Sequence, residues 1–336
     1  MKTKFVIPFI FLLGCYTYSK EKSAEDYLVW LKNDKIEVGI LKEVGARVVV
    51  LRKPGGINIF KADSNLWINA NQTKPKVDAF ANFKAYNGHI VWLGSQQEWW
   101  TKQEINQNRK NQKANWPPDP YIIYDDYKIV EKSDNYIKLY GNKSPVSGVQ
   151  LVKELQIKND GKVTFKTTLV GTRKEGVNWD IWMNSRMDGF DQVFAPIDTT
   201  YKFDLIVKEN PQKEVTKFKI ENGYFTFHPS VPRKNEQVQE VHLKPSKEFI
   251  VGVKNNILFI TRFKMENPEE LSPGHRQIEL YNSINKTGDD TLLELEIHGS
   301  YRRLYEGDSS EMSLEWELLE VSEKELEIVK ILNGIR

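Results

Sequence analysis

Residues 292–317 read LLELEIHGSYRRLYEGDSSEMSLEWE, and apolar side chains alternate with polar ones at both ends of this stretch. The alternation runs over residues 293–298 and again over residues 313–318. Successive side chains of a β-strand point to opposite faces of the sheet, so a period of two indicates one buried face and one polar face. This stretch therefore predicts two strands that each line a hydrophobic core.

Alternation of the same kind covers residues 36–40 and 162–169. Shorter β-rich runs, separated by turn signals such as KNDG at 158–161, predict further strands. These are expected at residues 47–51, 89–93, 127–131, 136–141, 149–157, 178–184, 224–228, 249–254, 257–263 and 277–282. The capping-box pattern SEKE at 322–325 predicts a short C-terminal helix that runs to Leu332. The fold class is therefore expected to be all-β.

Two long segments lack any regular pattern. Residues 61–88 are rich in Asn, Lys and Pro, and residues 94–120 are rich in Gln, Asn and Trp. Long irregular segments on a β scaffold are usually functional or disordered, and the tryptophans of the second segment favour order.

The N-terminus has the pattern of an export signal. Lys2 and Lys4 precede the apolar run FVIPFIFLL at 5–13, which is too short to cross a bilayer as a helix. The following LLGC resembles a lipobox, the bacterial signal for lipidation of a cysteine, here Cys15. We therefore expect a signal peptide at 1–14, a lipidated cysteine and spacer at 15–27, and one domain at 28–336. The alternative is an ordinary signal peptide that contains a cysteine.

This interpretation predicts a lipid-anchored protein of the bacterial cell envelope, on the periplasmic or surface face, with the membrane as its partner through Cys15. Residues 1–14 contain two lysines and no acid, so the 48 basic residues fall to 46, the number of acidic residues. A formally neutral chain argues against nucleic acid as a partner. Cys15 is the only cysteine, so no disulfide can form within the chain. We expect a monomer.

Tryptophans are concentrated around the second irregular segment. Trp92, Trp99, Trp100 and Trp116 lie there, close to several Gln, Asn and Glu residues. Aromatic faces stack on the C–H faces of sugar rings, while amides and carboxylates bind the hydroxyl groups. These four residues are our candidates for carbohydrate binding. The alternative is that they fill one end of the β core, since each indole buries a large apolar area. Because alternation would turn only one of two neighbours inward, the Trp99–Trp100 pair favours binding.

Three glutamates near the C-terminus could share one face of a sheet. Glu294 and Glu296 are two residues apart, and Glu279 lies on the preceding predicted strand. Crowded carboxylates can have raised pKa values that suit general acid–base catalysis. The alternative is a solvated sheet face.

Other chemistries lack support in the sequence. The five histidines show no zinc-binding spacing such as HExxH, so no metal is expected. Neither phosphate-binding glycine motifs nor a GxSxG nucleophile motif occurs. We therefore expect no cofactor.

Several segments together resemble a known superfamily. VGARV at 44–48 and GGINI at 55–59 are similar to the opening of aldose 1-epimerases (galactose mutarotases), and residues 292–317 are similar to their close. Gly88-His89 with Trp92, followed by Trp116-Pro117-Pro118, resembles a bacterial family of unknown function within this superfamily. The resemblance implies a β-supersandwich, in which large antiparallel sheets stack and one face holds a sugar.

The resemblance also implies site residues. Mutarotases use a glutamate and a histidine, and the matching glutamate is Glu296, with Glu294 as the alternative register. Their mid-chain His-x-aromatic-aromatic-Asn motif corresponds to residues 180–184, where Asn184 fits but Asp180 replaces the histidine. His89 is then a candidate acid from the facing loop.

Three functions remain open. The first is a carbohydrate-binding lipoprotein, with or without epimerase activity. The second is a carbohydrate lyase or hydrolase on the same scaffold, and the third is a non-catalytic structural or interaction lipoprotein. Arg262 is a further substrate-binding candidate, although an ion pair elsewhere is the usual role of an arginine on a strand, and the same choice applies to Arg47.

Overall fold

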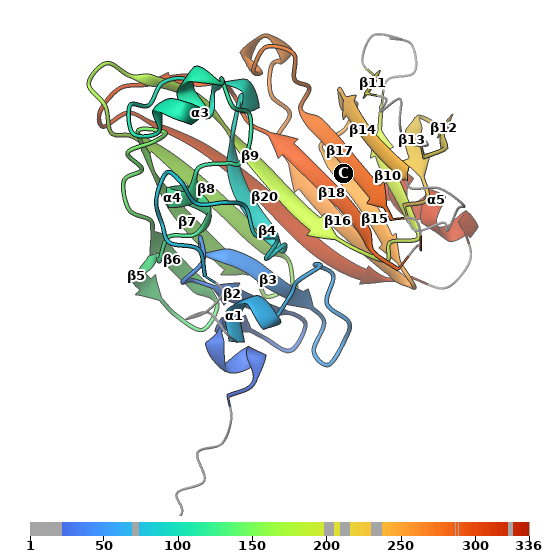
Figure 1. The fold of residues 1–336 in the computed structure, drawn as a ribbon. Coiled ribbons are helices and arrows are strands. Elements are labelled where there is room, and N and C mark those ends of the chain that lie inside the picture. The colour runs from blue at the N-terminus through green and yellow to red at the C-terminus, as the bar shows by residue number, and fades with distance from the viewer. Residues whose placement is uncertain are drawn as a thin grey trace, which may run out of the picture.

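The computed structural model shows a molecule built of two stacked sheets (Figure 1). The structure describes residues 22–68, 74–197, 205–208, 216–229, 237–285, 287, 289–321 and 325–335, with the backbone alone for 205–208, 237 and 325–329. The predicted signal peptide and Cys15 lie outside the described residues.

Within the described part of the chain, the strands form two ten-stranded antiparallel sheets. The first sheet contains, in spatial order, β1 (Val29–Lys32), β2 (Glu37–Leu41), β3 (Arg47–Arg52), β4 (His89–Gly94), β9 (Val177–Met187), β18 (Thr291–His298), β17 (Ile278–Ile284), β14 (Gln237–Leu243) and β11 (Leu205–Lys208), with β19 (Arg302–Leu304) paired to β9. The second sheet contains β12 (Phe218–Glu221), β13 (Tyr224–Phe227), β10 (Gln192–Pro196), β15 (Phe249–Lys254), β16 (Ile257–Phe263), β20 (Ser309–Glu320), β8 (Val163–Gly171), β7 (Val149–Ile157), β6 (Tyr136–Tyr140) and β5 (Lys128–Lys132).

Helices are short and lie outside the sheets. They are η1 (Ala24–Tyr27), α1 (Asn65–Ile68), η2 (Gln96–Glu98), α3 (Gln107–Asn111), α4 (Pro120–Ile123), η4 (Pro268–Glu270) and α5 (Glu325–Gly334). Leu332 of α5 packs on the outer face of the second sheet, against Val251 and Ile260 among others. Among the described residues, no helix combines the length and the apolar character needed to cross a membrane.

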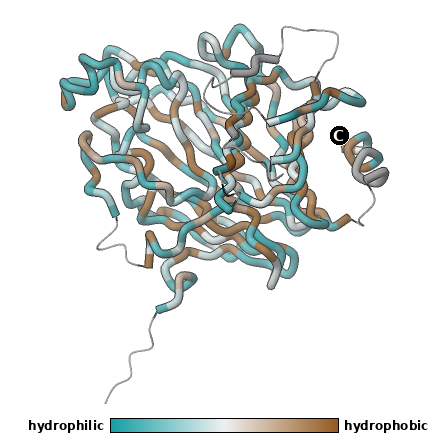
Figure 2. Tube along the Cα trace, turned by 45° about the vertical axis from the view of Figure 1, so that its right-hand side comes forward, coloured by the Kyte–Doolittle hydropathy of each residue, from teal (hydrophilic) through white to brown (hydrophobic). Residues whose placement is uncertain are grey.

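The main core lies between the two sheets. On β8, Val163, Phe165, Thr167 and Leu169 are buried, and the residues that alternate with them are partly exposed. Trp316 of the neighbouring β20 stacks on Phe165, with ring centroids 5.5 Å apart. Along the strands in Figure 2, apolar and polar segments alternate at short spacing, as one buried face requires. The all-β prediction and the C-terminal helix are thus confirmed.

The Gly45-Ala46-Arg47 motif has a structural role at the start of β3. Gly45 has a φ of 71°, and a Cβ at this position would lie 2.5 Å from the carbonyl oxygen of Ile123. Arg47 is buried and donates from Nη1 to Asn87 O (3.0 Å) and from Nη2 to Ile123 O (2.9 Å). Arg47 therefore faces neither the pocket nor an acidic partner, and instead ties two loops to β3.

Six observed strands were not predicted: β1, β10, β11, β12, β14 and β19. The most important is β14, QVQEVHL, because it carries two residues of the site described below. Val238, Glu240 and His242 fall on one face of this strand, and Gln239 is buried on the other. Both faces thus mix polar and apolar residues, and the period-two signal is lost.

Candidate functional site

Polar side chains form rows across four neighbouring strands of the first sheet. Cross-strand pairing places residues of one sheet face opposite one another on β9, β18, β17 and β14, with β4 at one side. The rows are Trp92–Trp182–His298, Asn184–Glu296–Glu279–His242 and Arg186–Glu294–Tyr281–Glu240. The three predicted glutamates therefore do share one sheet face.

An open cavity of about 400 Å³ lies over these rows. Three indoles, those of Trp92, Trp116 and Trp182, line one part of it, and the carboxylates of Glu240, Glu279, Glu294 and Glu296 line the other. Trp92 and Trp182 pack edge to face with ring centroids 5.1 Å apart, and Trp116 is 44% exposed. The volume is in the range of small-molecule sites.

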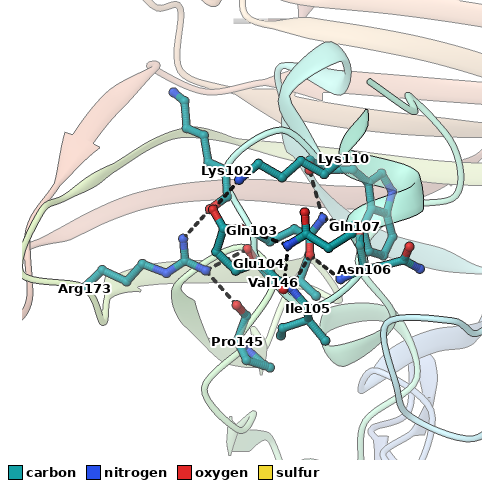
Figure 3. Close-up of polar contacts among 11 residues, drawn as sticks. Lys102, Gln103, Glu104, Ile105, Asn106, Gln107, Lys110, Pro145, Val146 and Arg173 are labelled. Atoms are coloured by element: carbon teal, nitrogen blue, oxygen red, sulfur yellow. Dashed lines mark hydrogen bonds and ion pairs between the residues drawn. The ribbon is translucent and has the colours of Figure 1, made fainter. Parts of the chain in front are cut away.

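The loop that carries Trp116, residues 94–120, is held by its own polar side chains (Figure 3). Gln103 donates from Nε2 to the carbonyl oxygens of Trp100 and Asn106 and accepts from the backbone N–H groups of Ile105 and Asn106. Arg173 donates to Lys102 O (2.7 Å) and Pro145 O (2.6 Å), which joins this loop to the next. The long 94–120 segment is therefore ordered, as its tryptophans indicated.

Glu294 is a paired carboxylate. Arg186 donates from Nε to Glu294 Oε1 at 2.6 Å, and Asn184 donates from Nδ2 to Glu294 Oε2 at 3.1 Å. Burial alone would raise the pKa of Glu294, but the Arg186 charge and these hydrogen bonds hold the pKa below its usual value. Glu294 is thus the ionised member of the group.

Glu296, two residues further on, is in a different environment. Trp182 donates from Nε1 to Glu296 Oε2 at 2.5 Å. Burial, together with the charges of Glu279 and Glu294, raises the pKa of Glu296 well above its usual value. Two carboxylates on one strand face therefore favour opposite protonation states.

His298 lies between two acids. Its Nδ1 is 3.4 Å from Asp180 Oδ2, and its Nε2 is 3.5 Å from Glu279 Oε2. Burial opposes the charged imidazolium, but Asp180 and Glu279 outweigh burial and raise the pKa of His298 to about 9. Asp180 is itself fixed by the backbone N–H of Gly94, which donates to Oδ1 at 2.9 Å.

A second histidine flanks Glu279 from the other side. His242 Nε2 is 3.0 Å from Glu240 Oε1, and His242 Nδ1 is 3.6 Å from Glu279 Oε2. His275 comes from the segment before β17. Its ring centroid lies 5.9 Å from the ring centroid of His242 and 4.8 Å from that of His298. Glu279 is therefore surrounded by imidazoles.

The structure brings together most of the predicted site residues. Glu279, Glu294, Glu296, Trp92 and Trp116 line the cavity. Asn184 and Asp180 lie just behind them, where they orient Glu294 and His298. Trp99 is buried in a second layer, with its ring centroid 5.8 Å from that of Trp92 and its Nε1 bonded to Leu93 O.

Three predicted residues lie elsewhere. His89 projects from the opposite face of β4 into the core, where its Nδ1 is 2.9 Å from Ser185 Oγ and its ring contacts Phe165. Burial lowers the pKa of His89 well below its usual value, so it is not an acid of the pocket. Arg262 lies on the second sheet, with Nη1 2.7 Å from Glu317 Oε2, which is the ion-pair alternative.

Trp100 is fully buried and donates from Nε1 to Pro117 O (2.7 Å). The expectation that only one of Trp99 and Trp100 turns inward fails, because these residues follow the 3₁₀ helix η2 and do not form a strand. Strand alternation does not apply there.

Sequence reasoning missed several residues of this face. They are His298, His242, Trp182, Arg186 and Tyr281. For two of them a signal was present: His298 follows Glu296 by two residues, and Arg186 follows Asn184 by two, so strand parity puts each pair on one face. His242 had no such signal, because β14 was not recognised.

Comparisons with known proteins agree with this architecture. A family model described as "Domain of unknown function (DUF4380)" matches residues 28–319. No curated protein matches the chain at a significant level.

Solved structures with the same architecture are distant in sequence. The Slr1438 protein from Synechocystis sp. PCC 6803 is 10% identical, with a TM-score of 0.55 over 90% of this chain and 99% of that one. A "putative aldose 1-epimerase" from Klebsiella pneumoniae is 12% identical, with a TM-score of 0.53 over 90% and 82%. Another, from Escherichia coli K12, is 10% identical, with a TM-score of 0.52 over 88% and 99%. At these identities the likeness concerns the fold. The chain belongs to the DUF4380 family of domains of unknown function, and its fold is that of the galactose mutarotase-like proteins.

Proposed function

We propose that this protein binds a carbohydrate in the cavity over the first sheet. The observation that carries this proposal is the division of the cavity into an indole wall (Trp92, Trp116 and Trp182) and a carboxylate floor. A sugar ring has the same division, because its C–H groups form apolar faces and its hydroxyl groups lie around the rim. Tryptophan combines a large apolar face with one N–H donor, which suits a ligand of this mixed character.

The polar floor also has the donors and acceptors that hydroxyl groups need. Glu294 and Glu279 present carboxylate oxygens, and Arg186 has an Nη1 group that makes no hydrogen bond within the protein. A buried donor left without a partner costs free energy, so a ligand hydroxyl at this point would be favoured. Mutarotase-like neighbours in the solved structures add support at the level of the fold.

A titration of sugars tests this proposal. Residues 16–336, which lack the predicted leader and the lipidated cysteine, are titrated calorimetrically with mono- and oligosaccharides. Because Trp116 is partly exposed, Trp116→Ala should leave the fold intact while weakening the best ligand about tenfold or more, or ~1.4 kcal/mol.

The matched control is Tyr305→Ala, an aromatic residue of similar exposure outside the cavity. It should retain the affinity of the wild type. Equal affinities in the Trp116→Ala and Tyr305→Ala variants would remove the indole wall from the binding site, and no binding across a broad panel would favour the interaction-protein alternative.

A second candidate function is proton transfer at the anomeric carbon of an aldose. Mutarotation requires a base for the anomeric hydroxyl and an acid for the ring oxygen. At the cavity floor, a carboxylate oxygen of Glu279, a carboxylate oxygen of Glu296 and an imidazole nitrogen of His298 all lie within 4.8 Å of one another. In the mid-chain motif Asp180 stands where mutarotases have a histidine. Here an imidazole comes instead from His298 on a different strand, and its Nδ1 contacts Asp180.

This candidate predicts that the wild type accelerates the interconversion of α- and β-anomers, followed by NMR exchange spectroscopy. Both Glu296→Gln and His298→Gln should slow the exchange at saturating sugar by about 100-fold or more. Glu315→Gln, a strand glutamate on the second sheet, serves as the control. Exchange that no variant slows would mean that these groups do not catalyse it.

A further inference from the structure

Three side chains from different parts of the chain meet at one side of the cavity floor. His242 comes from β14, His275 from the segment before β17, and Glu279 from β17, and all three are buried. One ligand atom of each lies within 4.8 Å of the other two. We propose that His242, His275 and Glu279 bind a divalent transition-metal ion, with Zn²⁺ as the first candidate.

The spacing of the atoms is that of ligands and not of hydrogen-bond partners. His242 Nδ1 lies 3.6 Å from Glu279 Oε2, and neither buried atom makes a hydrogen bond. Zinc binds imidazole nitrogen and carboxylate oxygen at about 2.0–2.1 Å, so two ligands of a tetrahedral ion are about 3.4 Å apart. An ion between these atoms would satisfy both of them.

The surroundings of His242 have the order expected around a metal ligand. Glu240 Oε1 lies 3.0 Å from His242 Nε2, and this contact places the ring proton on Nε2. The lone pair of Nδ1 is then directed at Glu279. A carboxylate that holds the outer nitrogen of a ligating histidine is a regular feature of metal sites.

The charge of the floor also favours a cation. Glu240 and Glu279 lie on the paired strands β14 and β17, and the one guanidinium among these rows, Arg186, is paired with Glu294. A buried carboxylate group of this kind is costly unless cations compensate it. A divalent ion bound beside Glu279 would supply such a cation.

Three protein ligands leave a fourth position of a tetrahedral ion open. Glu240 and Glu279 both line the cavity, so this position would face it. The ligand class expected there is an oxygen donor, such as a hydroxyl or carboxylate group of the bound molecule. Two histidines and one glutamate with an open position form a known type of catalytic metal site.

This inference reverses the expectation from the sequence that no metal binds. The three ligands are 33 and 4 residues apart, and no spacing of this kind forms a recognisable motif. Only the antiparallel pairing of β14 with β17 brings His242 opposite Glu279.

The experiment is a metal titration of residues 16–336 prepared without a polyhistidine tag and stripped with a chelator. Co²⁺ is added first, because its visible absorption reports nitrogen and oxygen ligands, and Zn²⁺ is then added to displace it. We expect about one ion per chain. His275→Gln should weaken binding at least 100-fold, and Glu240→Gln should weaken it about 10- to 100-fold.

His228→Gln is the matched control, since His228 is an exposed histidine away from the cluster. It should bind like the wild type. Circular dichroism checks each fold, and Glu240→Gln decides the matter if His275→Gln unfolds. Absence of a stoichiometric ion in the wild type, or equal affinities in Glu240→Gln and His228→Gln, would overturn the proposal.

Metal binding and carbohydrate binding are tested separately. Sugar titrations of the metal-free and the metal-loaded protein show whether the carbohydrate proposal holds without the ion. If the metal proposal is wrong, the metal-free protein still binds sugar. If the carbohydrate proposal is wrong, Co²⁺ still gives its absorption spectrum and no sugar binds.

Discussion

At the scale of single residues, the site depends on small differences between neighbours. Glu294 and Glu296 share one strand face, yet the first faces a guanidinium and the second faces an indole and two carboxylates. The sequence shows that these glutamates share a face, because this follows from parity. It cannot show their partners, because Arg186 and Trp182 come from a strand more than 100 residues away.

The pair of Arg186 and Glu294 gives a prediction about stability. Both side chains are buried, so removal of one leaves an uncompensated charge. Arg186→Met should lower the free energy of unfolding by about 3–5 kcal/mol, measured by urea denaturation. The double variant Arg186→Met/Glu294→Gln should recover much of this loss. A single variant as stable as the wild type would mean that the pair is not desolvated.

Lys153 gives a prediction about pH. Its Nζ is buried and donates to Gly45 O at 2.6 Å, and burial, with a contribution from Arg47, lowers the pKa of Lys153 to about 7. In the unfolded chain the pKa is 10.5. Between these values the unfolded state binds a proton that the folded state lacks, so stability rises with pH.

From pH 7 to 9, the free energy of unfolding of the wild type should rise by about 2–3 kcal/mol more than that of Lys153→Met. Denaturant titrations of both proteins at each pH measure the difference. Parallel pH profiles would show that Lys153 stays protonated in the folded protein.

At the scale of elements, the sequence predicted strands well wherever one face is apolar. β7 and β8 match their predicted residues closely, since burial alternates along the whole of β8 and departs from alternation in β7 only at Val152. β14 was not predicted, because polar Gln239 is buried on one of its faces and polar His242 on the other. The mixture that hides β14 from the sequence includes Glu240 and His242, the two residues that β14 contributes to the candidate site.

Strand order lies beyond what alternation can predict. The rows of the site join β9, β18, β17 and β14, and only the pairing of β17 with β18 connects neighbours in sequence. Three predicted glutamates could therefore be placed on one face, because they lie on that pair. Their histidine and indole neighbours could not.

At the scale of the whole molecule, the fold is shared with proteins that are 10–12% identical over most of their length. A core of this kind requires apolar alternation and not particular residues, so sequences can diverge while the sheets persist. Fold alone does not decide the reaction, and the side chains of the cavity must do so.

Attachment to the membrane is a separate prediction, based on the LLGC pattern at 12–15. Cys15→Ser in the full-length chain should move the protein from the membrane fraction to the soluble fraction of bacterial cells and abolish labelling by a fatty-acid analogue. Because a multiply acylated cysteine anchors firmly, the shift should be nearly complete. Unchanged labelling in Cys15→Ser would refute the lipoprotein assignment.

The central claim is that the indole wall and the carboxylate floor hold a sugar. The most direct measurement is a crystal structure of residues 16–336 with the tightest-binding sugar of the panel. We predict that one ring face lies on Trp116 or Trp92, with hydroxyl groups in hydrogen-bond contact with Glu279 or Glu294. A sugar bound at another surface, with this cavity filled by water alone, would contradict the claim.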